Sequence, residues 1–265
     1  MKIDLSGKLA IVSGSTAGIG LGVGKALASC GANVVIVGRA AAKVDEAIAA
    51  IKREVPDAQL RGCVADLGTA EGAQRLFEAE PTADILVNNL GVFNEVDFFD
   101  TPDEEWERFY QVNVISGVRL SRHYVNDMVA RKWGRVIFVS SESGIAIPAN
   151  MINYGTTKAA NLAVSHGLAK RLAGTGVTVN AILPGPTFTD GVEEMLKDAV
   201  AQSGRSLRDE ADHFVRSARP SSIIQRVAEV DEVANLVAYL ASPLSSATTG
   251  AALRVDGGVV DSMAI

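Results

Sequence analysis

Short apolar runs rich in β-branched residues alternate with longer helical patterns along this 265-residue chain. Several of the runs are apolar almost throughout, as in parallel strands that helices cover on both faces. The alternation predicts an α/β fold in which a doubly wound parallel sheet of seven strands forms a single domain, residues 1–265. The expected strands are 9–14, 33–39, 59–67, 84–91, 135–143, 177–185 and 251–258, and the expected helices are 18–30, 40–54, 69–79, 103–131, 151–174 and 230–241.

Residues 187–225 interrupt this rhythm after the sixth strand. They are polar and charged, with helical periodicity around 192–201 and 207–217. Sheets of this kind bind ligands at the carboxyl ends of their strands, and long excursions there are often functional. We therefore expect a substrate lid, with a surface insertion without function as the alternative.

Charge and hydropathy exclude several classes of function. The net charge of −6 argues against nucleic acid as the main partner, although a local basic pocket for a phosphate is compatible with it. No apolar run reaches the roughly 18 residues that span a bilayer, and the first residues lack the apolar stretch of a signal peptide. We expect a cytoplasmic protein without membrane contact, with Cys30 and Cys63 reduced in the core. The three histidines show no ligand spacing, so no metal site is expected: His123, His166 and His213.

A glycine-rich stretch, SGSTAGIGLGVG at 13–24, joins the first strand to the first helix. Three familiar templates fail here. A P-loop would need glycine where Ile19 stands and Ser or Thr where Ala26 stands. The G-x-G-x-x-G pattern would need glycine at Val23, and the G-x-S-x-G nucleophile turn meets Thr16 at its centre.

The remaining pattern is Gly14-x-x-x-Gly18-x-Gly20. A glycine turn that opens a helix presents free N–H groups and the positive end of the helix dipole, which suits a pyrophosphate. Gly22 and Gly24 lie beyond the turn, inside the helix, where glycine costs about 1 kcal/mol relative to alanine. We interpret these two as positions of close packing without ligand contact.

Four polar residues further along the chain indicate acid–base chemistry. Tyr154 and Lys158 lie four residues apart on one helix face, Ser141 ends a strand, and Asn113 lies within the long helical pattern. A free tyrosine has a pKa near 10, and a neighbouring ammonium group favours the phenolate and lowers that pKa. Tyr154 is then a general acid/base, Lys158 its modulator, and Ser141 a donor to the substrate oxygen.

Together the glycine turn and these four residues resemble the short-chain dehydrogenase/reductase family. Further matches are Asn88-Asn89-Leu90-Gly91, Asp66, Pro184-Gly185 with Thr189, and Val255-Asp256-Gly257-Gly258. The resemblance covers essentially the whole chain except 187–225. It implies a Rossmann-type fold and an oxidoreductase that interconverts a ketone and a secondary alcohol by hydride transfer. It also implies that Lys158 holds the nicotinamide ribose, and that Asn113 breaks its helix and seats a water linking Lys158 to solvent.

The resemblance assigns the cofactor contacts residue by residue. Asp66 would accept from the adenine amino group, and residues 88–91 would line the adenosine ribose. The expected set is Ser13, Gly14, Ser15, Thr16, Gly18, Ile19, Gly20, Arg39, Asp66, Leu67, Asn89, Leu90, Gly91, Tyr154, Lys158, Pro184, Gly185, Thr187 and Thr189.

The end of the second strand indicates which nicotinamide cofactor is used. NAD enzymes of this architecture usually carry Asp or Glu there to bind the ribose 2′-hydroxyl, but this chain has Gly38. Arg39 follows and can pair with a 2′-phosphate, with Ser15, Thr16 and Lys43 as further contacts. The sequence predicts NADP(H), with NAD as the alternative.

The substrate itself stays open at this stage. We expect Glu142, Ile147, Met151 and Phe188 to line the pocket. One alternative is a 3-oxoacyl-(acyl-carrier-protein) reductase, which would need a basic docking patch. Others are a non-catalytic dinucleotide sensor and an NADP-bound epimerase or dehydratase. Relatives pair their two long helices into a homotetramer, which we expect here as well. The basic docking patch of a carrier-protein reductase would come from Arg131, Lys132, Lys170 and Arg171.

Overall fold

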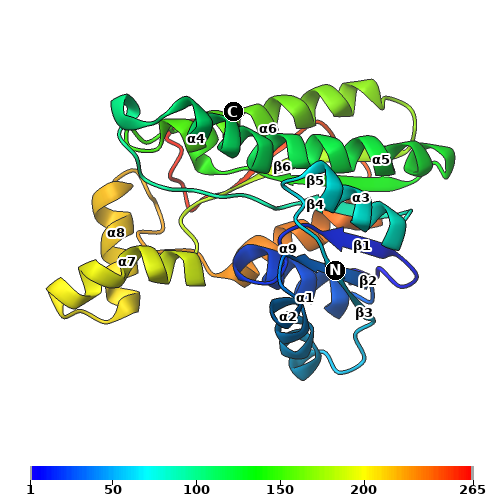
Figure 1. The fold of residues 1–265 in the computed structure, drawn as a ribbon, viewed down its shortest axis with the longest axis horizontal. Coiled ribbons are helices and arrows are strands. Elements are labelled where there is room, and N and C mark those ends of the chain that lie inside the picture. The colour runs from blue at the N-terminus through cyan, green and yellow to red at the C-terminus, as the bar shows by residue number, and fades with distance from the viewer. Residues whose placement is uncertain (1, 264–265) are drawn as a thin grey trace.

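A computed structural model describes residues 2–263, and within them a single seven-stranded sheet forms the centre of the molecule (Figure 1). All neighbouring strands are parallel, in the order β3-β2-β1-β4-β5-β6-β7. The order reverses beside β1, which pairs with β2 on one side and β4 on the other; such a switch point is where open α/β sheets bind ligands. The predicted doubly wound α/β sheet is confirmed. The strands are β1 Leu9–Val12, β2 Asn33–Gly38, β3 Leu60–Val64, β4 Ile85–Asn88, β5 Gly134–Val139, β6 Val177–Pro184 and β7 Ala252–Val255.

Helices cover both faces of this sheet (Figure 1). One face packs on α1, α2 and α9, and the opposite face on α3, α5 and α6. Strands β5 and β6 are buried along their whole length, which explains their continuous apolar sequence. The helices are α1 Gly18–Ser29, α2 Ala41–Glu54, α3 Ala70–Ala79, α4 Asp103–Tyr110, α5 Ser116–Ala130, α6 Ile152–Arg171, α7 Asp190–Ser203, α8 Leu207–Ala218 and α9 Val230–Ala241.

The helix expected over 103–131 is interrupted. Between α4 and α5, residues Gln111–Ile115 form a π-helical turn, so the helix does break at Asn113 as the resemblance implies. The sequence Thr101-Pro102 before an acidic first turn is typical of a helix with Thr as its N-cap and Pro as its first residue. Pro102 is instead the N-cap, and the Thr101 hydroxyl donates to the Asp97 carbonyl at 2.7 Å.

The excursion after β6 folds into α7 and α8, which stand to one side of the two helical layers (Figure 1). They share a small apolar core of their own, formed by Leu196, Ala211, Val215 and Val227. Thr189 caps α7, and Ser206 caps α8 through bonds to the backbone of the first turn. The segment expected to be a lid is therefore a packed helical pair at the side of the sheet that holds the site.

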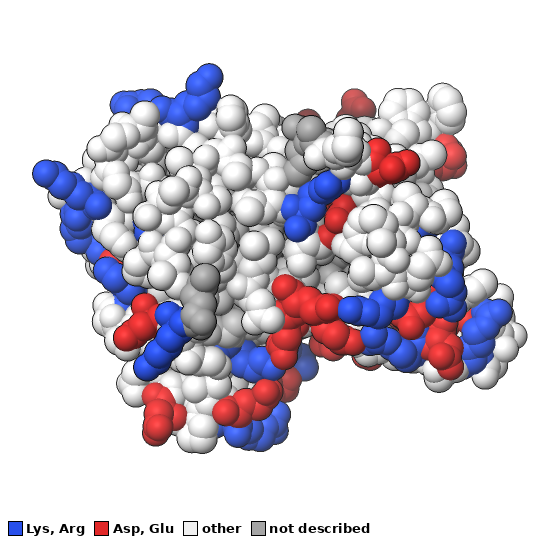
Figure 2. All heavy atoms as spheres, turned by 180° about the vertical axis from the view of Figure 1, so that it is seen from behind, with Lys and Arg blue, Asp and Glu red and all other residues white. Residues whose placement is uncertain are grey.

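The surface is mixed in charge. On the face seen in Figure 2, the centre is largely uncharged, and acidic and basic side chains lie next to one another along its lower part. This distribution agrees with the net charge of −6 and offers no broad basic field on that face. Between residues 2 and 263, no helix combines the length and apolarity needed to cross a bilayer.

Candidate active site

The glycine turn after β1 has a backbone that side chains would disturb. Gly14 and Gly18 have φ angles of +64° and +53°, in the left-handed region that favours glycine. Gly20 has an ordinary φ, but a Cβ there would lie 2.3 Å from the Gly14 carbonyl oxygen. The three glycines of the sequence pattern are thus required by the tight turn itself.

The first turn of α1 leaves its backbone N–H groups available. Its N-cap is Ala17, no described side chain caps it, and no acidic residue lies in the first turn. Uncapped N–H groups at a helix start carry partial positive charge and bind anions. This end of α1 therefore fits the pyrophosphate of a dinucleotide.

Ser13 and Asn89 hold the turn against β4. The Asn89 side chain donates to the carbonyls of Ser13 and Gly14 at 2.9 and 3.0 Å. The Ser13 hydroxyl in turn accepts from the backbone N–H groups of Asn89 and Leu90, each at 2.9 Å. The shape of the turn is fixed by residues from two strands, which is consistent with a preformed cradle.

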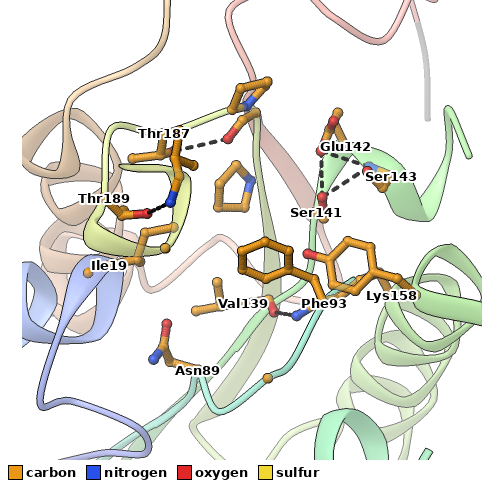
Figure 3. A pocket seen from close by; sticks show the side chains of 18 of the residues that line it. Ile19, Asn89, Phe93, Val139, Ser141, Glu142, Ser143, Lys158, Thr187 and Thr189 are labelled. Carbon is orange, nitrogen blue, oxygen red and sulfur yellow. Dashed lines mark hydrogen bonds between the residues drawn. The ribbon is translucent and has the colours of Figure 1, made fainter. Parts of the chain in front are cut away.

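A cavity of about 390 Å³ opens beside this turn, at the carboxyl ends of the central strands (Figure 3). Most of the predicted cofactor residues reach it. Those that line it are Gly14, Gly18, Ile19, Gly20, Asn89, Leu90, Gly91, Tyr154, Lys158, Pro184, Gly185, Thr187 and Thr189. The predicted residues outside its walls are Ser13, Ser15, Thr16, Arg39, Asp66 and Leu67.

Ser15 departs most clearly from its expected role. Its hydroxyl is fully buried, donates to the Val12 carbonyl at 2.7 Å and accepts from the Val37 N–H at 2.9 Å. This side chain ties β1 to β2 and is not free to bind a phosphate. Leu67 is also buried, in the core between β3 and the helices on that face.

Tyr154, Lys158 and Ser141 meet on one wall of the cavity. Tyr154 and Lys158 lie one turn apart on α6, and Ser141 follows the end of β5. Lys158 and Ser141 are labelled in Figure 3. The Lys158 ammonium group donates to the Val139 carbonyl at 3.0 Å and lies 5.4 Å from the centre of the Tyr154 ring. Two chain segments, α6 and the end of β5, thus bring the expected acid, its cation and a hydroxyl donor together.

The pKa of Tyr154 is raised, contrary to the expectation that Lys158 lowers it. Burial is the main cause, and the Glu142 carboxylate adds to it, while the Ser141 hydroxyl and Arg219 act in the opposite direction. Burial also lowers the pKa of Lys158 to about 8. The expectation considered only the cation, whereas removing the phenolate from water costs more here. A phenol that stays neutral near pH 7 is suited to donate a proton.

Asn113 lies behind this wall rather than in it. Its side-chain oxygen accepts from the Val92 N–H at 2.8 Å, and its amide donates to the Val92 carbonyl at 2.9 Å and the Thr157 hydroxyl at 3.0 Å. Its own carbonyl accepts from Asn161. Asn113 therefore anchors the loop after β4 to α6.

The substrate side of the cavity is only partly as expected. Glu142 and Met151 line it, but Ile147 lines a neighbouring hollow instead. Phe188 packs against the core of α7 and α8, with the Arg208 guanidinium over its ring. Both residues were expected to line the pocket, but neither of them does.

Several lining residues were not identified from the sequence. Phe93 places its ring 6.2 Å from that of Tyr154, and Phe214 and Arg219 reach the cavity from α8 and its end. Arg219 forms an ion pair with Glu142 at 3.0 Å. The only signal for Arg219 was a single cation at the end of an amphipathic segment, which is also typical of a solvated surface.

Comparisons with known proteins find relatives that match nearly the whole chain. A family model described as enoyl-(acyl carrier protein) reductase matches residues 14–260. The chain is 47% identical to an uncharacterised oxidoreductase, YvaG of Bacillus subtilis, covering 99% of this chain and 100% of that one. It is 31% identical to a 3-oxoacyl-(acyl-carrier-protein) reductase of Aquifex aeolicus, with 98% and 100% covered. The structure of L-sorbose reductase from Gluconobacter frateurii, complexed with NADPH and L-sorbose, superposes with a TM-score of 0.92 at 29% identity, covering 99% of this chain and 100% of that one.

Proposed function

Because the chain belongs to the short-chain dehydrogenase/reductase family of NAD(P)-dependent oxidoreductases, we propose that it reduces a ketone to a secondary alcohol with NADPH. One observation carries the proposal: Tyr154, Lys158 and Ser141 line the same cavity as the uncapped start of α1. A dinucleotide held at α1 and a carbonyl held at Tyr154 would lie side by side. A sensor without catalysis would not need these three groups together.

The nicotinamide, when bound, supplies the hydride to the carbonyl carbon. Negative charge then develops on the carbonyl oxygen, and Tyr154 protonates it as general acid. Ser141 donates a hydrogen bond to the same oxygen, once its proton turns away from Glu142. Lys158 holds a positive charge beside the phenolate that forms. Tyr154 carries this proton at neutral pH, because both the ordinary pKa of a tyrosine and its raised pKa here lie above 7.

The test is NADPH oxidation against a panel of carbonyl compounds, with Tyr154→Phe as the matched variant. We expect turnover in the wild type and a loss of at least ~100-fold in kcat for the variant, because general acid catalysis is removed. NADPH binding, measured by fluorescence titration, should be largely retained. Substantial residual turnover in Tyr154→Phe would refute the assignment of Tyr154.

NADPH is favoured over NADH by the end of β2. A Cβ at Gly38 would lie 2.4 Å from the Thr16 methyl carbon, so an acidic side chain has no room there. Arg39 is exposed and forms no ion pair with the described residues, whereas Lys43 is engaged by Glu46 at 2.7 Å. Arg39 is therefore available for the 2′-phosphate.

Arg39→Ala tests this preference directly. We expect the Kd for NADPH to rise roughly tenfold or more, because a hydrogen-bonded charge contact is lost. The Kd for NADH should change little, which serves as the internal control. If wild-type protein binds NADH as tightly as NADPH, the preference is wrong.

A carrier-protein substrate has weaker support. Of its four expected docking cations, Arg131 is engaged by Asp84, Asp127 and the Ala83 carbonyl. Lys132, Lys170 and Arg171 would have to form the patch without it. We therefore favour a small ketone as the substrate. We also propose that the enzyme is cytoplasmic.

A further inference from the structure

A part-buried ion pair joins the residue after Ser141 to the excursion after β6. Glu142, next to Ser141, is only 4% exposed, and its Oε1 accepts from Arg219 Nε at 3.0 Å. Arg219 stands at the end of α8, so its guanidinium comes from the segment expected to be a lid. Neither side chain is among the predicted cofactor contacts or the group formed by Tyr154, Lys158 and Ser141.

The second oxygen of Glu142 is also engaged. Its Oε2 accepts from the Ser141 hydroxyl at 2.5 Å and from the Ser143 N–H at 2.9 Å (Figure 3). The carboxylate is thus fixed by three donors, and one of them is the hydroxyl that faces the substrate. Moving Arg219 away would leave this buried carboxylate without its only cationic partner among the described residues.

The rest of the pocket adds little positive charge. Of the described residues that line the cavity, Lys158 and Arg219 are the cations, and Lys158 belongs to the cofactor side. Glu95 and Asp190 add negative charges, and Glu95 lies at the wall shared with the neighbouring hollow. The apolar side chains on the walls of the cavity include Phe93, Met151, Val192, Met195 and Phe214.

We propose that the Glu142–Arg219 pair makes this pocket selective for neutral ketones over ketones that carry a carboxylate. A substrate carboxylate would have to take Arg219 from Glu142, which leaves a buried, uncompensated charge, or lie unpaired beside the buried Glu142 carboxylate. A neutral substrate leaves the pair intact. Its hydroxyl or carbonyl oxygen can accept from Nη2 of Arg219, which has no partner among the described residues. The inference rests on the proposed ketone reduction.

Two pairs of probe ketones isolate the charge. L-Sorbose and 5-keto-D-gluconate share the keto group and its neighbouring stereocentres. At the far end of the molecule, L-sorbose carries a hydroxymethyl group and 5-keto-D-gluconate a carboxylate. Acetoacetamide and acetoacetate differ only in an amide or a carboxylate. In wild-type enzyme with NADPH, we expect kcat/KM for the neutral member to exceed that for the anion by at least ~tenfold, because displacing a buried counter-ion is costly.

Glu142→Gln releases Arg219 while keeping a side-chain acceptor for Ser141 and Ser143. We expect the neutral-to-anion ratio to fall by at least ~tenfold in this variant, because Arg219 can then pair with the substrate carboxylate. Glu95→Gln is the matched control: it removes the same charge from the pocket wall but releases no arginine. Its ratio should stay near the wild-type value, because an exposed charge is screened by solvent.

Arg219→Gln provides a second, independent variant. It removes the cation, so the neutral-to-anion ratio should rise above the wild-type value. A wild-type ratio at or below one overturns the inference, and so does an unchanged ratio in a folded, NADPH-binding Glu142→Gln. If Glu142→Gln does not fold, an unchanged or lower ratio in Arg219→Gln overturns it. If no probe is turned over with either cofactor, the proposed reduction of small ketones fails first, and this inference with it.

Discussion

Lys158 is a buried cation, and its burial lowers the stability of the folded protein. It is 4% exposed, and burial lowers its pKa from 10.5 to about 8. A lysine whose pKa is lower in the folded state penalises folding whenever it is protonated. The penalty is fully present below pH 8, falls between pH 8 and 10.5, and is absent above that range. A shift of this size corresponds to a penalty on the order of 3 kcal/mol.

Lys158→Met should therefore stabilise the protein while abolishing its activity. We expect the free energy of unfolding at pH 7 to rise by about 2 kcal/mol, less than the full penalty because the bond to the Val139 carbonyl is lost. The gain should shrink as the pH rises from 8 towards 10.5. Urea unfolding at several pH values checks this. A variant that is less stable than the wild type at pH 7 would contradict it.

Single residues also show how far the sequence could predict the site. Tyr154, Lys158 and the three glycines of the turn were identified from their spacing together with the family resemblance. The structure places them around one cavity. The pKa of Tyr154 could not be predicted in the same way. It depends on desolvation and on the Glu142 carboxylate, which are set by packing between distant segments.

Among the elements, the contact between α1 and α9 shows the strictest packing requirement. A Cβ on Gly22 would lie 2.1 Å from Cγ1 of Val230, a branched side chain at the start of α9. The sequence-based interpretation of Gly22 as a packing position agrees with this contact. The helix accepts a residue of low helix propensity because the two backbones must come close.

Gly22→Ala should destabilise the protein although alanine is the better helix former. We expect a loss of about 1–2 kcal/mol, because overpacking outweighs a propensity gain of about 1 kcal/mol. Adding Val230→Ala should recover much of this loss, because it removes the obstructing methyl group. Thermal unfolding of the single and double variants measures both effects.

Gly24→Ala is the matched control on the same helix. Its Cβ would lie 3.1 Å from Cδ1 of Ile36, the end of a flexible side chain that can move. We expect a change within ~0.5 kcal/mol, because the propensity gain and the crowding offset one another. Equal losses at Gly22 and Gly24 would show that helix packing on α9 is not the cause.

Element positions were largely predictable, and element ends were less so. Most expected strands extend past the observed ones at the carboxyl end; for example, 135–143 becomes Gly134–Val139. The extra residues, Ser141 among them, leave the sheet to form the wall of the cavity. The periodicity of the sequence does not show where a strand stops pairing. It also does not show that Arg219 pairs with Glu142, 77 residues earlier in the chain.

The assembly of the whole molecule is still a prediction. The outer side of α6 carries small, exposed residues, and a Cβ at Gly167 would meet nothing within 4 Å. Ala163 lies one turn before it and is also exposed. Small residues allow helices of two copies to pack closely, which supports the homotetramer expected from the family resemblance.

Gly167→Arg tests this assembly. We expect wild-type protein to scatter light as four chains at micromolar concentration, and the variant to form smaller species, because a long charged side chain separates the paired helices. Gly167→Ala, which adds only a methyl group, should keep the wild-type mass. A monomeric wild type would count against the tetramer.

The link between the glycine turn and Asn89 also bears on the order in which the protein folds. The two residues that clamp the turn, Ser13 and Asn89, are 76 positions apart, and they meet only after β4 has paired with β1. The first three strands alone therefore lack the bonds that shape the phosphate cradle. A dinucleotide therefore binds the complete sheet and not its N-terminal half alone. By mass action, such binding stabilises the native state against partly folded intermediates.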